Sequence, residues 1–297
     1  MKNLKTIKYA FIIFLMSITL TGLCWADGCK ATYGKGSIQF KLATGSPGEL
    51  GLLKEIAKTF NSKNDTSICW VKAGSGKSLK LLKTNKVDIV MVHAPAAEKQ
   101  AIKDGWAIKR SLIGSNEFYI VGPKNDPAGI SKAATASDAY AKIAKSKSKF
   151  LSRGDNSGTN KKELAIWKKA GITPDSEKNS KWYIITKAFM MATLKKADQV
   201  YGYFMTDSST WVAGKKDLHN LKILFRGDPV LINTYHGLCQ PEDGSRTQQA
   251  ASKFIDFLSS EQGQKIIHDY GKNLYGEAMY NDAQYAKQYD HYSFRNI

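Results

Sequence analysis

The sequence predicts an α/β fold in two lobes, each with a mostly parallel sheet flanked by helices. Three observations support this prediction. Strand-like and amphipathic helical segments alternate from residue 38 onward. The segment 124–135 is turn-rich, and the segment 229–239 is extended. Each would carry the chain from one lobe to the other. The segments that follow the second crossing would then return to the first lobe, so that both ends of the chain build it.

The first lobe is predicted from three strand–loop–helix units. A strand over 38–43 precedes a helix whose apolar face is Leu50, Leu53, Ile56, Ala57 and Phe60. A strand over 67–72 precedes a helix that contains Leu79 and Leu82, and a strand over 88–92 precedes a helix over 96–104. A further strand over 118–123 leads to the first crossing. Helices over 246–259 and 261–270 complete this lobe.

The second lobe is predicted from the segment between the crossings. It contains helices near 138–147, 158–171 and 187–198 and strands at 150–151, 201–205 and 221–225, and residues 206–209 open another helix. The predicted organisation is a signal peptide over 1–26, a first lobe over 27–122 and 233–297, and a second lobe over 123–232.

The amino terminus predicts export. Lys2, Lys5 and Lys8 precede an apolar run that ends near Ala26, which is typical of a cleaved signal peptide. The run is short for a membrane span. Lipid anchoring is the minor alternative, because Cys24 follows Leu23 and Cys29 has no apolar run directly before it. The expected location is therefore the periplasm.

The chain is strongly basic. Its net charge of +18 becomes +15 once the three lysines of residues 1–26 are removed. The lysines are spread along the helical segments, and no nucleic-acid-binding motif is present, so we expect no nucleic-acid partner. A positive field would attract a small anion instead.

The predicted mature chain keeps Cys29, Cys69 and Cys239. Two of the three could pair in an oxidising compartment, and the sequence leaves the choice of pair open. The scattered histidines and the absence of a CxxC motif predict no metal site and no cofactor.

Polar loops follow several predicted strands. The loops at 44–48, 73–77 and 93–95 and the central segment 152–159 all stand at strand ends, where α/β folds bind ligands. The central segment runs from a strand into a helix, so its unpaired backbone N–H groups and helix dipole suit an anion. Arg153 adds a permanent charge. Candidate contacts are Thr44, Gly45, Ser46, Ser75, Arg153, Ser157, Gly158 and Thr159.

Each of these features has a simpler interpretation. The glycine-bearing loops could be tight turns, and Asp155 or Asn156 could cap a helix. The Arg153-Gly154-Asp155 tripeptide could indicate adhesion, although it stands at a strand–helix junction. No G-x-S-x-G elbow is present, and nothing in the sequence places a base beside a nucleophile, so we expect no enzyme. His93 is expected to be structural or to lie behind the contact residues.

Several stretches together resemble the periplasmic substrate-binding proteins of tungstate-type ABC importers, in the type II periplasmic-binding superfamily. They are DIVMVHAPAAEKQAIKDGWAIKR, EFYIVGPKNDPAGI, FLSRGDNSGTNKKELAIWKKAGI, ATLKKADQVYGYFMTDSSTW and FIDFLSSEQGQKII. The resemblance implies two lobes that close on a tetrahedral oxyanion and deliver it to a membrane permease. It implies that Arg153 and Thr159 contact the ligand, with Thr44 and Ser75 as hydroxyl donors.

One departure from the family concerns the anion. The first loop reads Thr44-Gly45-Ser46-Pro47-Gly48, where the family has a run of three threonines and a serine. The bound anion therefore stays open between tungstate, phosphate, sulfate and a small organic anion, and a surface antigen or adhesin on the same scaffold is the other alternative. Phosphate often keeps a proton, which Asp155 or Glu49 could accept if either points inward. We expect a monomer.

Overall fold

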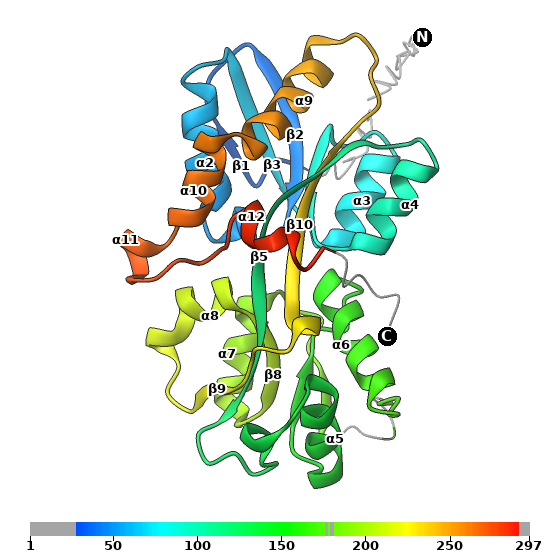
Figure 1. Ribbon diagram of the computed structural model, residues 1–297, viewed down its shortest axis with the longest axis vertical. Helices are drawn as coiled ribbons and strands as arrows, with labels where there is room; N and C mark the ends of the chain where they lie inside the picture. Colours follow the sequence, from blue (N-terminus) through cyan, green and yellow to red (C-terminus); the bar gives the residue numbers. More distant parts are fainter. Residues whose placement is uncertain (1–27, 176–177, 179–180, 291–297) are drawn as a thin grey trace, which may run out of the picture.

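Two strands join the two halves of the molecule. The computed structural model describes residues 28–175, 178 and 181–290. Strands β5 (Ile108–Pro123) and β10 (Ile232–Cys239) run through the waist between an upper and a lower half (Figure 1). We call residues 28–117 and 232–290 the first half and residues 118–231 the second half. Strand β5 pairs with β10 up to Glu117 and with β8 and β9 from Phe118 onward.

The strands form one hydrogen-bonded sheet of mixed direction. Its order is β1-β3-β2-β4-β10-β5-β8-β6-β7, and β9 pairs with β5. Strand β2 pairs in parallel with β3 and β4, and β6 pairs in parallel with β7 and β8. The other pairs are antiparallel. The prediction of mostly parallel sheets is thus correct for the inner strands of each half, while the connecting strands are antiparallel.

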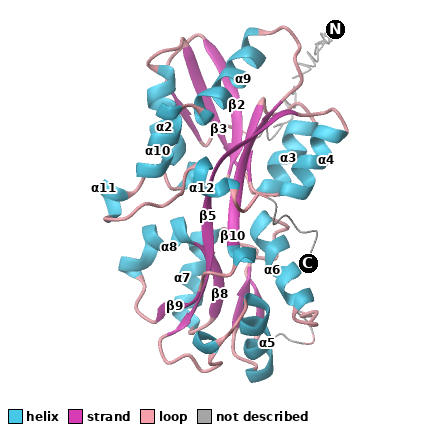
Figure 2. Ribbon diagram, viewed as in Figure 1, coloured by secondary structure: helices cyan, strands magenta, loops and turns pink. Residues whose placement is uncertain are grey.

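Helices cover both faces of the sheet in the first half (Figure 2). The strands are β1 (Ala31–Tyr33), β2 (Ile38–Thr44), β3 (Thr66–Lys72) and β4 (Ile89–Val92). The helices are α1 (Ser46–Glu49), α2 (Leu52–Asn61), α3 (Ser75–Lys83), α4 (Pro95–Lys103), α9 (Arg246–Ser259), α10 (Glu261–Asp269), α11 (Lys272–Tyr275) and α12 (Ala283–Lys287). Apolar residues of α2 and α9 pack together on one face, with Phe60 and Phe254 at a ring separation of 5.0 Å.

The second half repeats this arrangement around its own core. Its strands are β6 (Phe150–Ser152), β7 (Tyr183–Ile185), β8 (Tyr203–Asp207) and β9 (Leu221–Phe225). Its helices are α5 (Ala136–Ser146), α6 (Gly158–Lys169), α7 (Met190–Val200) and α8 (Ser208–Gly214). The rings of Tyr140, Phe150 and Trp167 meet within 4.4–5.1 Å of one another and fix α5 and α6 against the sheet.

Several elements differ from the sequence-based expectation. Strands β1 and β7 and helices α11 and α12 were not predicted, and two further elements have other bounds than expected. Strand β5 begins at Ile108, ten residues before the predicted strand, because its early part pairs with β10 rather than standing alone. The predicted loop 44–48 contains the start of α1, where Pro47 lies in the first turn, a position that tolerates proline. The division of the chain into lobes at 122/123 and 232/233 stays a prediction.

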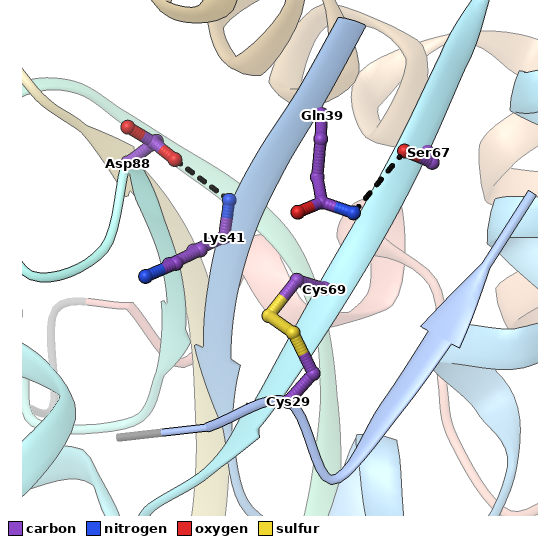
Figure 3. The surroundings of a disulfide bond; sticks show 6 residues. All are labelled: Cys29, Gln39, Lys41, Ser67, Cys69 and Asp88. Carbon is purple, nitrogen blue, oxygen red and sulfur yellow. Dashed lines mark hydrogen bonds between the residues drawn. A yellow bond between two sulfur atoms is a disulfide. The ribbon is translucent and has the colours of Figure 1, made fainter. Parts of the chain in front are cut away.

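The disulfide joins Cys29 to Cys69 (Figure 3). It ties the amino-terminal segment to β3 beside the antiparallel pair of β1 and β3. Among the cysteines that the structure describes, Cys239 is the free one, and it is buried in β10. Nearby, Asp88 accepts a hydrogen bond from the backbone N–H of Lys41 at 2.6 Å, and Gln39 donates to Ser67 at 3.5 Å. These contacts hold β2 between its two neighbours.

The predicted signal peptide lies outside the described residues. Within the described part of the chain, none of the helices has the length and apolarity needed to cross a bilayer.

Candidate functional site

A small cavity, partly open to solvent, lies between the two halves. Both halves and both waist strands contribute to its wall. The lining residues are Gly45, Ser46, Gly74, Ser75, Met91, His93, Phe118, Arg153, Ser157, Thr159, Phe189, Asp207, Asn233 and Tyr235. The structure therefore brings together six of the eight residues predicted to contact a ligand; Thr44 and Gly158 are not in the lining.

The first loop contributes Gly45 and Ser46. Thr44 ends β2 and is fully buried, and its hydroxyl donates to the Met91 carbonyl at 2.9 Å. Its own carbonyl accepts from Trp70 Nε1 at 3.1 Å. The Thr44 hydroxyl therefore donates its proton within the first half and not toward the cavity. Ser46 instead reaches the other half, where its hydroxyl donates to Asp207 Oδ2 at 3.5 Å.

The amino terminus of α3 supplies donors from the first half. Gly74 is the N-cap residue, and the first intrahelical bond runs from Ser78 N–H to the Gly74 carbonyl. The N–H groups of Ser75 and Gly76, in the first turn of α3, therefore have no carbonyl partner earlier in the helix. Ser75 Oγ accepts the backbone N–H of His93 at 3.1 Å. The proton of the Ser75 hydroxyl consequently stays available for a ligand.

The amino terminus of α6 supplies donors from the second half. Ser157 is the N-cap residue, and its Oγ accepts the N–H of Asn160 at 3.3 Å. Thr159 lies in the first turn, is 2% exposed and lines the cavity. Gly158 lies beside them against His93, where a Cβ would be 2.5 Å from the His93 Cε1 atom. The positive ends of α3 and α6 thus serve one cavity from opposite sides.

Arg153 is the positively charged member of the wall. It is 5% exposed, and its Nη2 donates to Asp155 Oδ2 at 2.5 Å. Asp155 also accepts the N–H of Ser157 at 3.2 Å, so the carboxylate orients the guanidinium. The guanidinium lies 5.4 Å from the ring centre of Phe189. Its Nε is buried and has no hydrogen-bond partner among the described residues, which leaves a donor for a ligand.

A buried network supports the Arg153 loop from behind. Glu163 of α6 accepts from Ser152 Oγ at 2.7 Å and from the Tyr183 hydroxyl at 2.8 Å. Burial raises the pKa of Glu163 to about 7, while the hydrogen bonds from Ser152, Tyr183 and Asn160 lower it. The network joins β6, β7 and α6 where the central loop begins.

The side chains of His93 and Lys162 both have a lowered pKa. Burial, with Lys162 and Arg153 nearby, lowers the pKa of His93 to about 3, so the imidazole is neutral. Its ring lies 5.0 Å from that of Tyr235. Lys162 Nζ donates to the carbonyls of Val230 and Ile232 at 2.8 and 2.9 Å, where the chain enters β10. Burial lowers the pKa of Lys162 to about 7.

The carboxylate in the wall is Asp207, which the sequence analysis did not single out as a contact. Glu49 pairs with Lys72 at 2.8 Å, and neither Glu49 nor Asp155 is in the lining. Asp207 is 1% exposed and caps α8 by accepting the N–H of Thr210 at 2.8 Å. Asp207 stands at the end of a strand and before a helix, as the other polar loops do. That position could have marked Asp207 as a candidate contact from the sequence.

The remaining lining residues that the sequence did not assign lie on the waist strands, at the start of helix α7 and, for Met91, on β4. Phe118, Asn233 and Tyr235 come from β5 and β10, and Phe189 is the N-cap residue of α7. The sequence analysis did not recognise the start of β5. It therefore did not predict the pairing of β5 with β10, which brings these side chains to the cavity.

Within the described residues, no group of three or more His, Cys, Asp or Glu could hold a metal ion. The arrangement combines one arginine and several hydrogen-bond donors with one carboxylate, Asp207, whose oxygens already accept hydrogen bonds from Thr210 and Asn116. The arginine and the donors suit a small anion.

Comparisons with known proteins identify relatives over most of the chain. A family model described as a PBP superfamily domain matches residues 31–262. The curated tungstate-binding protein TupA of Peptoclostridium acidaminophilum is 33% identical over 94% of this chain and 98% of its own length.

Two solved structures show the same fold at similar identity. The tungstate-binding protein TupA of Desulfovibrio alaskensis is 36% identical, with a TM-score of 0.69 over 82% of this chain and 98% of that one. The tungstate ABC transporter structure from Geobacter sulfurreducens is 37% identical, with a TM-score of 0.70 over 80% of this chain and 100% of that one.

Proposed function

The chain belongs to the PBP superfamily, and we propose that it is the exported solute-binding component of an ABC importer, which captures a small tungstate-like oxyanion in the cavity between its halves. Three of its relatives with known names or structures are described as tungstate-binding or tungstate-transporting proteins. They support an oxyanion-binding role for this chain.

The observation that carries the proposal is the state of Arg153. A buried guanidinium with an unpartnered Nε stands in the wall, held by Asp155 and flanked by the amino termini of α3 and α6. A buried unpaired donor is costly, and an anion would satisfy it. Each charge-assisted hydrogen bond contributes about 1.5–3 kcal/mol.

The proposed contacts follow from the same geometry. Arg153, Ser75, Ser157 and Thr159 supply side-chain donors, and the first turns of α3 and α6 supply backbone N–H groups. Gly45 and Ser46 border the anion from the first half. For Gly158 we propose a packing role against His93, and for Thr44 a role in holding β2 to β4.

The proposal also covers the permease partner, the location and the oligomeric state. The ligand would be delivered to a membrane permease, as expected for a binding protein of an ABC importer. We propose binding without turnover, a periplasmic location reached through the signal peptide of residues 1–26, and a monomeric state.

Thermal unfolding tests the proposal. The purified mature chain is heated with tungstate, molybdate, sulfate, phosphate or small carboxylates. A ligand that binds only the folded state stabilises it by about 2.7 kcal/mol at 100-fold excess over its dissociation constant. We expect a raised midpoint with at least one tetrahedral oxyanion. No shift with any oxyanion, or a shift with carboxylates alone, would overturn the proposal.

A further inference from the structure

The ring of Phe189 lies close to one cation from each half. Phe189 lines the cavity and is the N-cap residue of α7 in the second half. The Arg153 guanidinium of the same half lies 5.4 Å from the ring centre. Lys72 Nζ, from the end of β3 in the first half, lies 4.3 Å from it. Strand β3 belongs to the upper half of Figure 1 and α7 to the lower half, so Lys72 reaches across the boundary.

The chain just before Phe189 is fixed to the central loop of the second half. The backbone N–H of Thr186 donates to the Ser152 carbonyl at 2.9 Å. The backbone N–H of Lys187 donates to the Arg153 carbonyl at 3.0 Å. Both bonds lie within the second half, so Phe189 keeps its place beside Arg153 when the halves separate.

Lys72 is held in the first half. Its Nζ pairs with Glu49 Oε1 of α1 at 2.8 Å, and the two side chains are 27% and 26% exposed. The Lys72 backbone is in register with Thr44 of β2, directly before the loop that borders the cavity. The ammonium therefore belongs to the first half and meets the Phe189 ring only when the halves are close together.

The contact between Lys72 and Phe189 favours the conformation in which the halves are together. An ammonium is attracted by the negative face of an aromatic ring. An interaction that exists in one conformation alone shifts the population toward that conformation. The donors Ser75, Arg153 and Thr159 are at most 5% exposed, so an anion bound to them leaves only after the halves part.

We propose that Lys72 and Phe189 form a clasp between the halves that retains the bound anion. The inference rests on the proposed function of the cavity. Lys72 is not in the cavity lining, so it acts through the Phe189 ring as a positioning residue. Loss of the clasp favours separation of the halves. It should therefore speed ligand release and leave the rate of association nearly unchanged.

The test measures both rates on matched variants. Surface plasmon resonance of the immobilised mature chain gives the association and dissociation rates of tungstate, or of another oxyanion that raises the unfolding midpoint if tungstate does not. Lys72→Met removes the cation and keeps an unbranched side chain. Lys83→Met is the control, because Lys83 Nζ lies 5.6 Å from the Trp106 ring centre within the first half, and neither residue lines the cavity. Thermal unfolding without ligand checks that each variant is folded.

We expect Lys72→Met to raise the dissociation rate by about three- to tenfold, the effect of one cation–π contact between partly buried groups. Lys72→Arg keeps a cation for the ring and should restore most of the wild-type rate. In the Phe189→Leu background, Lys72→Met should cause no further increase, because the ring that the cation contacts is already absent. Lys83→Met should leave both rates unchanged.

An unchanged dissociation rate in Lys72→Met would overturn the inference while leaving the proposed function intact. So would an equal increase in the wild-type and Phe189→Leu backgrounds. Slower association with unchanged dissociation would also overturn it, because Lys72 would then act only by attracting the anion through its charge. If no oxyanion binds the wild type, the proposed function itself fails and the inference with it.

Discussion

Gly158 and His93 meet directly across the boundary between the halves. A Cβ at position 158 would lie 2.5 Å from His93 Cε1 and 2.7 Å from Nδ1. Two other contacts lie nearby: a Cβ on Gly74 would be 3.2 Å from Ser157 Cβ, and one on Gly76 would be 3.0 Å from the Asn156 carbonyl. These glycines therefore allow the amino termini of α3 and α6, which face the cavity, to approach each other.

The first prediction concerns this contact. Gly158→Ala should weaken anion binding by about tenfold, because overpacking costs about 1–3 kcal/mol and would act only where the halves touch. Titration calorimetry gives the affinity. Leu164→Ala on the exposed side of the same helix is the control. Equal affinity in Gly158→Ala and the wild type would show that the halves need not approach this closely to bind.

The second prediction concerns Lys162. Its pKa is lowered to about 7 by burial, and a bound anion nearby would raise it, so binding takes up a proton above that pH. Tungstate affinity should therefore fall as the pH rises above 7, by up to about tenfold per pH unit because one proton is involved. Titrations at several pH values measure this slope. Lys162→Met should flatten it, and an identical slope in the variant would assign the proton to another group.

The third prediction concerns Glu163. Burial raises its pKa from 4.5 in the unfolded chain to about 7 in the folded one, so the folded state holds its proton more tightly. Its stabilising contribution is complete below pH 4.5 and is lost as the pH rises to 7, by about 3 kcal/mol in all.

Denaturant unfolding of the wild type and Glu163→Gln across this pH range provides the check. The variant should lose less stability between these pH values than the wild type does. Parallel curves would mean that folding does not raise the pKa of Glu163.

The fourth prediction concerns the disulfide. Cys29 and Cys69 are 40 residues apart, and the chain-entropy model gives such a crosslink about 4 kcal/mol of stability. Cys29→Ser should lower the free energy of unfolding by about 2–4 kcal/mol with little change in anion affinity, because neither cysteine lines the cavity. A large loss of affinity would instead link this edge of the sheet to the site.

The sequence predicted most of the elements that carry the candidate site. The strand before each polar loop and the helix after it were recognisable from apolar periodicity, as for Phe150–Ser152 followed by α6. The long β5 was recognised only from residue 118. Its earlier part is half-buried at first and then buried, and it gains its structure from antiparallel pairing with β10. Long-range pairing has no local sequence signal.

The lack of a local signal for long-range pairing also explains which residues of the candidate site were missed. Arg153, Ser75 and Thr159 stand at strand–helix junctions, which a sequence shows. Asp207 and Asn233 enter the cavity because sheet order places β8 and β10 beside the other strands, and sheet order is a property of the whole fold. The Ser46–Asp207 contact joins residues 161 positions apart, and nothing local indicated it.

The central claim is that Arg153 binds an oxyanion in the cavity between the halves. Titration calorimetry of tungstate, and of any other oxyanion that raises the unfolding midpoint, into the wild type and Arg153→Ala tests it most directly. Thermal unfolding without ligand confirms that the variant is folded. We expect measurable binding to the wild type and its loss in the variant. Equal affinity in both proteins would contradict the claim.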